Sequence, residues 1–99
     1  MWSASGTLLA TVAFGNETGS GWQTANLANP LPIAANTTYV CSVNSNTAYG
    51  ATNQGLAASV SNPPLSTVAD GDNGLFGSPG AFPTNSYQNS NYFRDLMFQ

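Results

Sequence analysis

The chain has very few charged residues and lacks two residue types on which most catalytic and anion-binding sites depend. Its 99 residues include no histidine, no lysine and a single arginine, and charged residues make up 5%, against about 25% in an ordinary globular domain. Without histidine or lysine, the usual general bases and nucleophile activators are missing. With a net charge of −3, the chain cannot neutralise a phosphate backbone, so we expect no nucleic-acid partner.

A long apolar run and a second cysteine are also missing. No apolar run approaches the roughly 20 residues that a membrane-spanning helix requires, so we expect no membrane insertion. Cys41 is the only cysteine, which excludes an intrachain disulfide. It lies in phase with Tyr39 and Val43, which predicts a small buried apolar side chain. The opening Met1-Trp2-Ser3 has neither the basic nor the apolar region of a signal peptide, so we expect any export signal to lie outside this chain.

The order of the polar and apolar residues predicts an all-β fold. At 99 residues the chain is expected to form a single domain, residues 1–99. Four segments alternate with the period of a strand: Thr7–Phe14, Trp22–Leu27, Thr38–Val43 and Asn91–Phe98. Pro30 and Pro32 cannot donate to a sheet and mark where pairing stops. The segment Gln54–Val60 could instead form one helical turn. These patterns predict an antiparallel β-sandwich.

Aromatic side chains are the main resource for a binding site. A sugar-binding surface requires flat exposed rings with amide groups nearby, and four rings stand next to glycine, asparagine or glutamine in the sequence: Trp22, Tyr49, Tyr87 and Tyr92. Sandwich cores also use such rings, because a buried tyrosine or tryptophan needs only one hydrogen-bond partner. We expect Trp22 and Tyr39 to be core residues, whereas the loop residues Tyr49 and Tyr87 fit either role.

The turn Asp70-Gly71-Asp72-Asn73-Gly74 is the only cluster of hard oxygen ligands. Asp70, Asp72 and Asn73 have the chemistry that Ca²⁺ prefers, although the spacing is not that of an EF-hand. The same residues are also those that tight turns favour for backbone reasons. We therefore expect no obligatory cofactor, with calcium as the single candidate.

The carboxylates do not form a catalytic pair. Asp70 and Asp72 share one turn, Glu17 lies in a glycine-rich loop, and Asp95 is adjacent to Arg94, its expected charge partner. A glycosidase requires two carboxylates held apart with split pKa values. No catalytic residue is therefore predicted.

Residues along the whole chain resemble the bacterial DUF4082 domain. They are Trp2-Ser3-x-x-Gly6-Thr7-Leu8-Leu9-Ala10, Phe14-x-Asn16-Glu17-Thr18, Gly21-Trp22-Gln23-Thr24, Pro30, Ala35-Asn36-Thr37-Thr38-Tyr39-Val40, Pro64-Leu65, Ala69-Asp70-Gly71, Asn73-Gly74, Phe82-Pro83, Tyr87 and Asn91-Tyr92-x-x-Asp95-x-x-Phe98. The resemblance implies a jelly-roll-like β-sandwich module of a secreted or cell-surface bacterial protein. It does not imply a reaction.

The resemblance also implies a missing part. Such domains normally carry further strands before the Trp2-Ser3-x-x-Gly6 turn, so we expect an incomplete sandwich whose exposed ladder groups pair with a neighbouring domain or another copy. Two functions are consistent with these features. One is a non-catalytic extracellular binding or adhesion module that contacts a glycan. The other is a structural module that self-assembles through sheet edges into oligomers or filaments.

Overall fold

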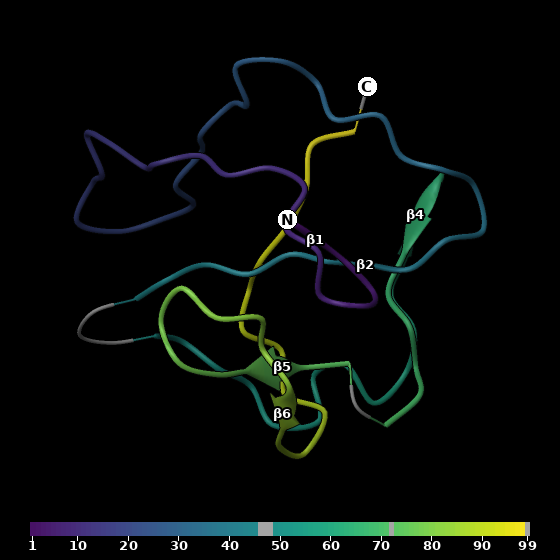
Figure 1. The fold of residues 1–99 in the computed structure, drawn as a ribbon. Coiled ribbons are helices and arrows are strands. Elements are labelled where there is room, and N and C mark those ends of the chain that lie inside the picture. Colours follow the sequence, from purple (N-terminus) through teal and green to yellow (C-terminus); the bar gives the residue numbers. More distant parts are fainter. Residues whose placement is uncertain (46–48, 72, 99) are drawn as a thin grey trace. The chain divides into compact units, whose positions relative to one another are not determined.

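A computed structural model describes residues 1–45, 49–71 and 73–98. The chain separates into two compact units, Met1–Val40 (unit 1) and Cys41–Gln99 (unit 2). Within the described ranges every regular element is a β-strand, and every strand pair is antiparallel (Figure 1). The all-β prediction is therefore confirmed, and no helix able to cross a membrane occurs in this part of the chain.

Unit 1 is closed by one short strand pair. Strand β1, Trp2–Ser3, pairs with β2, Tyr39–Val40, so that Trp2 faces Val40. The chain returns over β1 after the Ser3–Gly6 turn, because Leu9 donates its backbone N–H to the carbonyl oxygen of Met1 at 2.9 Å. Strand β2 lies inside the predicted Thr38–Val43 segment.

Unit 2 contains two hairpins. Strands β3, Ser61–Asn62, and β4, Leu65–Ser66, flank the Pro63–Pro64 bond, which is cis. Strands β5, Leu75–Phe76, and β6, Asn85–Ser86, form the second hairpin. Each of these strands is two residues long, and further backbone hydrogen bonds join the loops that flank them.

Three of the predicted strands are wrong. In Thr7–Phe14 only Leu8 forms a bridge, to Trp2, and in Asn91–Phe98 only Asn91 does, to Thr52. The segment Trp22–Leu27 is not in a strand. Alternating side chains favour a strand but do not supply the partner backbone that makes one. The alternative of a helical turn at Gln54–Val60 is also not observed, since this stretch forms β-turns instead.

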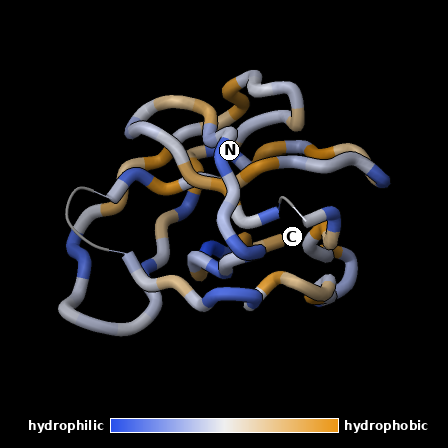
Figure 2. The backbone as a smooth tube through the Cα atoms, turned by 90° about the horizontal axis from the view of Figure 1, so that it is seen from below, coloured by the Kyte–Doolittle hydropathy of each residue, from blue (hydrophilic) through white to orange (hydrophobic). Residues whose placement is uncertain are grey.

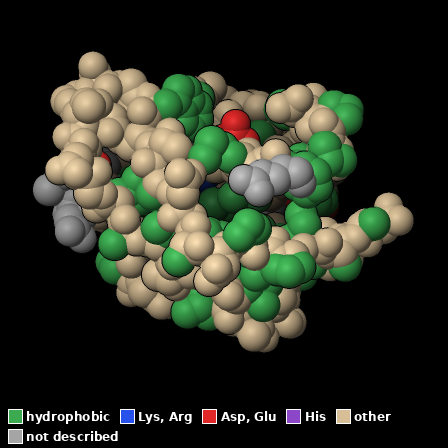
Figure 3. All heavy atoms as spheres, turned by 90° about the horizontal axis from the view of Figure 1, so that it is seen from above, with side chains coloured by type: hydrophobic (Ala, Val, Ile, Leu, Met, Phe, Trp, Pro, Cys, Tyr) green, Lys and Arg blue, Asp and Glu red, His purple; other side chains and the backbone are tan. Residues whose placement is uncertain are grey.

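The described residues form no extended apolar core, and the buried ones are Gly74, Pro83 and Ser90. None of the described hydrophobic side chains is fully buried, whereas Ser90 is only 1% exposed. Apolar and polar stretches alternate along the backbone (Figure 2). Hydrophobic side chains accordingly lie on the surface among neutral polar groups, and few charged atoms are visible in this view (Figure 3). Burial of single polar or small residues, rather than an apolar core, marks the tightly packed points.

Candidate functional site

Two segments of unit 2 are joined by backbone hydrogen bonds. The candidate residues Tyr49, Tyr87 and Tyr92 lie in these segments or near them in the sequence. Thr52 and Asn91 exchange two backbone hydrogen bonds, of 3.0 and 2.9 Å. Gln54 donates its backbone N–H to the carbonyl oxygen of Gln88 at 2.8 Å, and Leu56 donates to that of Asn89 at 2.9 Å. We call residues 52–56 and 87–91 the paired loops.

The second of the paired loops is a type I′ turn. Gln88 and Asn89 have φ angles of 50° and 47°, and Ser90 donates its backbone N–H to the Tyr87 carbonyl oxygen at 3.1 Å. Positive φ at both central residues defines this turn and favours asparagine or glycine. The Ser90 hydroxyl donates to the same carbonyl oxygen at 2.7 Å and reaches Asn53 Oδ1 at 3.3 Å. Ser90 thus links the turn that contains Tyr87 to the other paired loop, residues 52–56.

Tyr49 and Tyr92 form an aromatic pair at one end of the paired loops. Their ring centroids are 5.6 Å apart with an interplanar angle of 68°, the edge-to-face arrangement that aromatic rings prefer. Tyr49 is 68% exposed and Tyr92 is half-buried. Tyr92 therefore packs against Tyr49 and restricts the rotation of the exposed Tyr49 ring.

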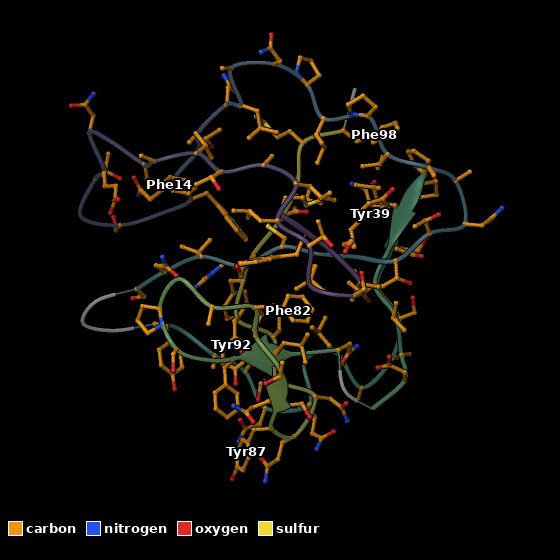
Figure 4. All side chains as sticks on the ribbon, in the orientation of Figure 1. Phe14, Tyr39, Phe82, Tyr87, Tyr92 and Phe98 are labelled. Atoms are coloured by element: carbon orange, nitrogen blue, oxygen red, sulfur yellow. The ribbon has the colours of Figure 1, made fainter. Side chains whose placement is uncertain are left out.

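Tyr87 stands at the turn, together with two unused amides. Its ring is 57% exposed, and it follows β6 directly (Figure 4). The side-chain amides of Gln54 and Gln88 are exposed and make no hydrogen bond to a described residue. Each amide offers both a donor and an acceptor. Tyr87 thus combines an open ring face with neighbouring polar groups that could bond a ligand.

Trp22 belongs to unit 1, and its predicted place in a core is wrong because it is 69% exposed. The loop before it is fastened by Gln23, whose Oε1 accepts from the Thr18 N–H at 2.8 Å and whose Nε2 donates to the Gly21 carbonyl oxygen at 3.1 Å. Tyr39, the other expected core residue, is half-buried, and its hydroxyl accepts from the Ala34 N–H at 2.9 Å. Sequence reasoning missed Gln23, although its position after the glycine-rich loop was a usable signal.

The residues proposed for calcium are used in different ways. Asp70 is exposed, and Asp72 lies outside the described residues. Asn73 Nδ2 donates to the Leu56 carbonyl oxygen at 2.8 Å and also to that of Val68. Because both partners are acceptors, the amide nitrogen must face them, and Asn73 Oδ1 is left buried without a partner. The described residues contain no group of three or more histidine, cysteine, aspartate or glutamate side chains that could hold a metal.

A comparison with protein families matches residues 1–94 to DUF4082, described as a domain of unknown function. The chain belongs to the DUF4082 family. No curated protein and no solved structure gave a significant match. The DUF4082 match spans most of both units, so the paired loops and the Trp22 loop belong to one family domain.

Two further side chains of this DUF4082 domain carry groups that often act in functional sites, the Cys41 thiol and the Arg94 guanidinium. Cys41 is a free, half-buried cysteine, and burial raises the pKa of its thiol above the ordinary 9.0, which disfavours the nucleophilic thiolate. The expected Arg94–Asp95 ion pair is wrong for the described residues. Arg94 donates to the Tyr92 carbonyl oxygen, while an Asp95 carboxylate oxygen accepts from the Leu96 N–H at 2.8 Å.

Proposed function

We propose that this DUF4082 domain is a non-catalytic binding or adhesion module of a bacterial extracellular or cell-surface protein, and that its ligand is a neutral glycan. The observation that carries this proposal is the Tyr49–Tyr92 pair, in which a half-buried ring holds a mostly exposed ring in place. A fixed, open ring gives the apolar face of a sugar a large contact area at low entropic cost. Unit 1 has an exposed ring of its own, Trp22.

The polar surroundings support a sugar rather than an apolar ligand. Gln54 and Gln88 present free amides near Tyr87, and the Tyr49 and Tyr87 hydroxyls make no hydrogen bond to a described residue. Specific sites combine aromatic contact area with a few polar groups that fix orientation. A neutral ligand is favoured because the chain has a single arginine and no lysine, so it cannot neutralise a polyanionic glycan.

The experiment is a glycan array followed by calorimetry on each sugar that binds. We expect Tyr49→Ala and Tyr87→Ala each to weaken binding by about tenfold or more, equivalent to about 1.4 kcal/mol. Tyr87→Phe keeps the ring and should lose less than Tyr87→Ala. Phe98→Ala removes another exposed ring and serves as the control with unchanged affinity. A sugar that binds equally well to both alanine variants would disprove the site.

A second candidate function, self-assembly, is favoured by a different observation. Residues 11–17 make no hydrogen bond to any described residue, and large apolar side chains are exposed along and just before them: Leu8, Leu9, Val12 and Phe14. Unpaired backbone groups beside apolar side chains are a template for pairing with another strand. The partner would be the same segment of a second copy, which supplies an identical set of unpaired groups and helps to complete a jelly-roll-like sandwich.

Light scattering over a range of protein concentrations tests the assembly. We expect oligomers that grow with concentration and do not respond to sugar. Val12→Pro removes a backbone donor and should prevent assembly, whereas Val12→Thr keeps the donor and the β-branched shape and should not. A monomer at all concentrations would reject this second function and leave the glycan proposal untouched.

A further inference from the structure

Asn73-Gly74 is the only asparagine–glycine dipeptide in the chain, and such a pair can modify itself. The Gly74 backbone nitrogen attacks Asn73 Cγ, a nitrogen–carbon bond forms, and the Cγ–Nδ2 bond breaks. Ammonia leaves with the proton from the Gly74 amide. Water then opens the cyclic imide at either carbonyl and gives aspartate or isoaspartate. Glycine permits the attack most readily because it has no Cβ and few backbone restrictions.

The fold holds the Asn73 side chain away from this reaction. Its amide nitrogen, the leaving group, donates to the carbonyl oxygens of Leu56 and Val68. These acceptors lie 17 and 5 residues away in the sequence, so the amide is fixed between two separate segments. Rotation of Cγ towards the Gly74 nitrogen would break both hydrogen bonds and leave both acceptors unsatisfied.

Gly74 is held just as firmly. It is buried, and a Cβ added to it would lie 2.1 Å from the Ser90 carbonyl oxygen and 3.0 Å from the Ser90 nitrogen. The backbone of Gly74 is therefore packed directly against Ser90, which is itself almost fully buried. The attacking nitrogen cannot shift without displacing the Tyr87–Ser90 turn, and the water that the second step needs is largely excluded.

We propose that Asn73-Gly74 is a latent deamidation site that reacts only when this part of unit 2 opens locally, and that the reaction then prevents the region from closing again. Local opening is the ordinary route by which buried groups become reactive. The product replaces the amide nitrogen with a carboxylate oxygen, which has no hydrogen to donate. That oxygen would face the carbonyl oxygens of Leu56 and Val68, so the link between the two segments is lost permanently.

Peptide mapping by mass spectrometry tests the first half of the proposal. The full chain is incubated in mildly alkaline buffer with and without urea, and conversion is followed at Asn73 and at Asn36, which is exposed, lies outside the strands and precedes Thr37. We expect Asn73 to react at least about tenfold more slowly in the folded chain than in urea, which corresponds to an opening cost of about 1.4 kcal/mol. The rate at Asn36 should change much less. Equal rates at Asn73 in both conditions would overturn the proposal.

Two variants test the mechanism and its consequence. Ser90→Ala removes the hydroxyl bonds to the Tyr87 carbonyl oxygen and to Asn53, which hold the turn whose backbone packs against Gly74, without touching the Asn73 amide. It should therefore accelerate conversion at Asn73 in the folded chain and leave the rate in urea unchanged. Asn73→Asp reproduces one product and should lower Tm and the hydrogen-exchange protection of the paired loops. Asn85→Asp adds the same charge at an exposed position and is the control. An Asn73→Asp variant with the Tm and protection of the unmodified chain would overturn the second half.

Discussion

Unit 1 and unit 2 have similar residue types but are held together differently. In unit 1, residues 11–17 and 24–33 make no hydrogen bond to any described residue, and the unit is closed at β1 and β2. In unit 2, loops that are far apart in the sequence are joined by backbone pairs and by the side chains of Asn73 and Ser90. Hydrogen bonds between loops therefore hold unit 2 together. Long parts of unit 1 have no hydrogen-bond partner among the described residues.

This difference shows which interactions hold segments together in a chain with few charges and little buried apolar surface. Leu8 is 55% exposed although its segment has a strong strand pattern, whereas the polar stretch around Ser90 is tightly packed. Most polar groups packed there are hydrogen-bonded, apart from the buried Asn73 Oδ1 and Asn89 Oδ1, and each hydrogen bond between loops fixes two segments at once. Hydrogen bonds between separate loops, more than apolar patterning, account for the packing of unit 2 around Ser90.

The largest expected difference in stability is between two glycine-to-alanine variants, one in each unit. Gly74→Ala places a Cβ 2.1 Å from the Ser90 carbonyl oxygen and should destabilise unit 2 by about 3 kcal/mol. Gly15→Ala in unit 1 meets no atom within 4 Å and has no positive φ to lose, so it should be neutral or slightly stabilising. Urea unfolding of both variants measures the contrast. Equal effects would show that the two units are packed alike.

A smaller effect is expected when one polar link is removed. Ser90→Ala loses the hydroxyl bonds to the Tyr87 carbonyl oxygen and to Asn53 and should lower the free energy of unfolding by about 1 to 2 kcal/mol. Ser78→Ala removes an exposed hydroxyl and should change it by less than about 0.5 kcal/mol. A Ser90→Ala variant as stable as Ser78→Ala would mean that the paired loops do not depend on this link.

The pH dependence at Cys41 should be weaker still. Burial raises the pKa of this thiol in the folded chain, so the neutral thiol is favoured by folding. This contribution is fully present below the unfolded pKa near 9.0 and is lost as the pH rises through the higher folded pKa. Unfolding measured from neutral pH into the alkaline range should show stability falling, and Cys41→Ala should reduce the fall. An unchanged fall in that variant would assign it to other groups.

Calcium should have no measurable effect on either unit. Asn73 is committed to two carbonyl oxygens and its Oδ1 is buried, while Asp70 is exposed. A ligand that binds the folded state must raise Tm. Melting in excess Ca²⁺ and in excess chelator should therefore give the same Tm. A saturable rise with Ca²⁺ would turn the Asp70–Gly74 turn into a metal site and contradict this account.

The sequence was most informative where local chemistry decides the structure. The alternation in Thr38–Val43 correctly located β2, and the all-β prediction agrees with the described strands. Of the turn expected at residues 70–74, Asp72 lies outside the described residues, while Asp70 and Gly71 lie between β4 and β5. These features depend on backbone preferences of nearby residues, which a single sequence carries.

The sequence was least informative where a distant partner decides the structure. The strand pattern runs through the whole of Thr7–Phe14, but only residues 7–10 hydrogen-bond to residues 1–3. Residues 11–14 make no hydrogen bond to a described residue, and the neighbouring sequence does not predict this difference. The exposure of Trp22 is a similar case. Ser90 and Gly74 carried no signal, because a serine in a loop is usually exposed and the glycine is explained by a close approach from 16 residues away. Such close approaches appear only when the whole chain is folded.

The small extent of apolar burial among the described residues has a thermal consequence. Unfolding raises heat capacity mainly by wetting apolar groups, and wetting polar groups has the opposite sign. Since no described hydrophobic side chain is fully buried, the heat-capacity increment per residue should be small. The curve of stability against temperature is then shallow, and a module of this kind loses little of its order between a cold and a warm environment.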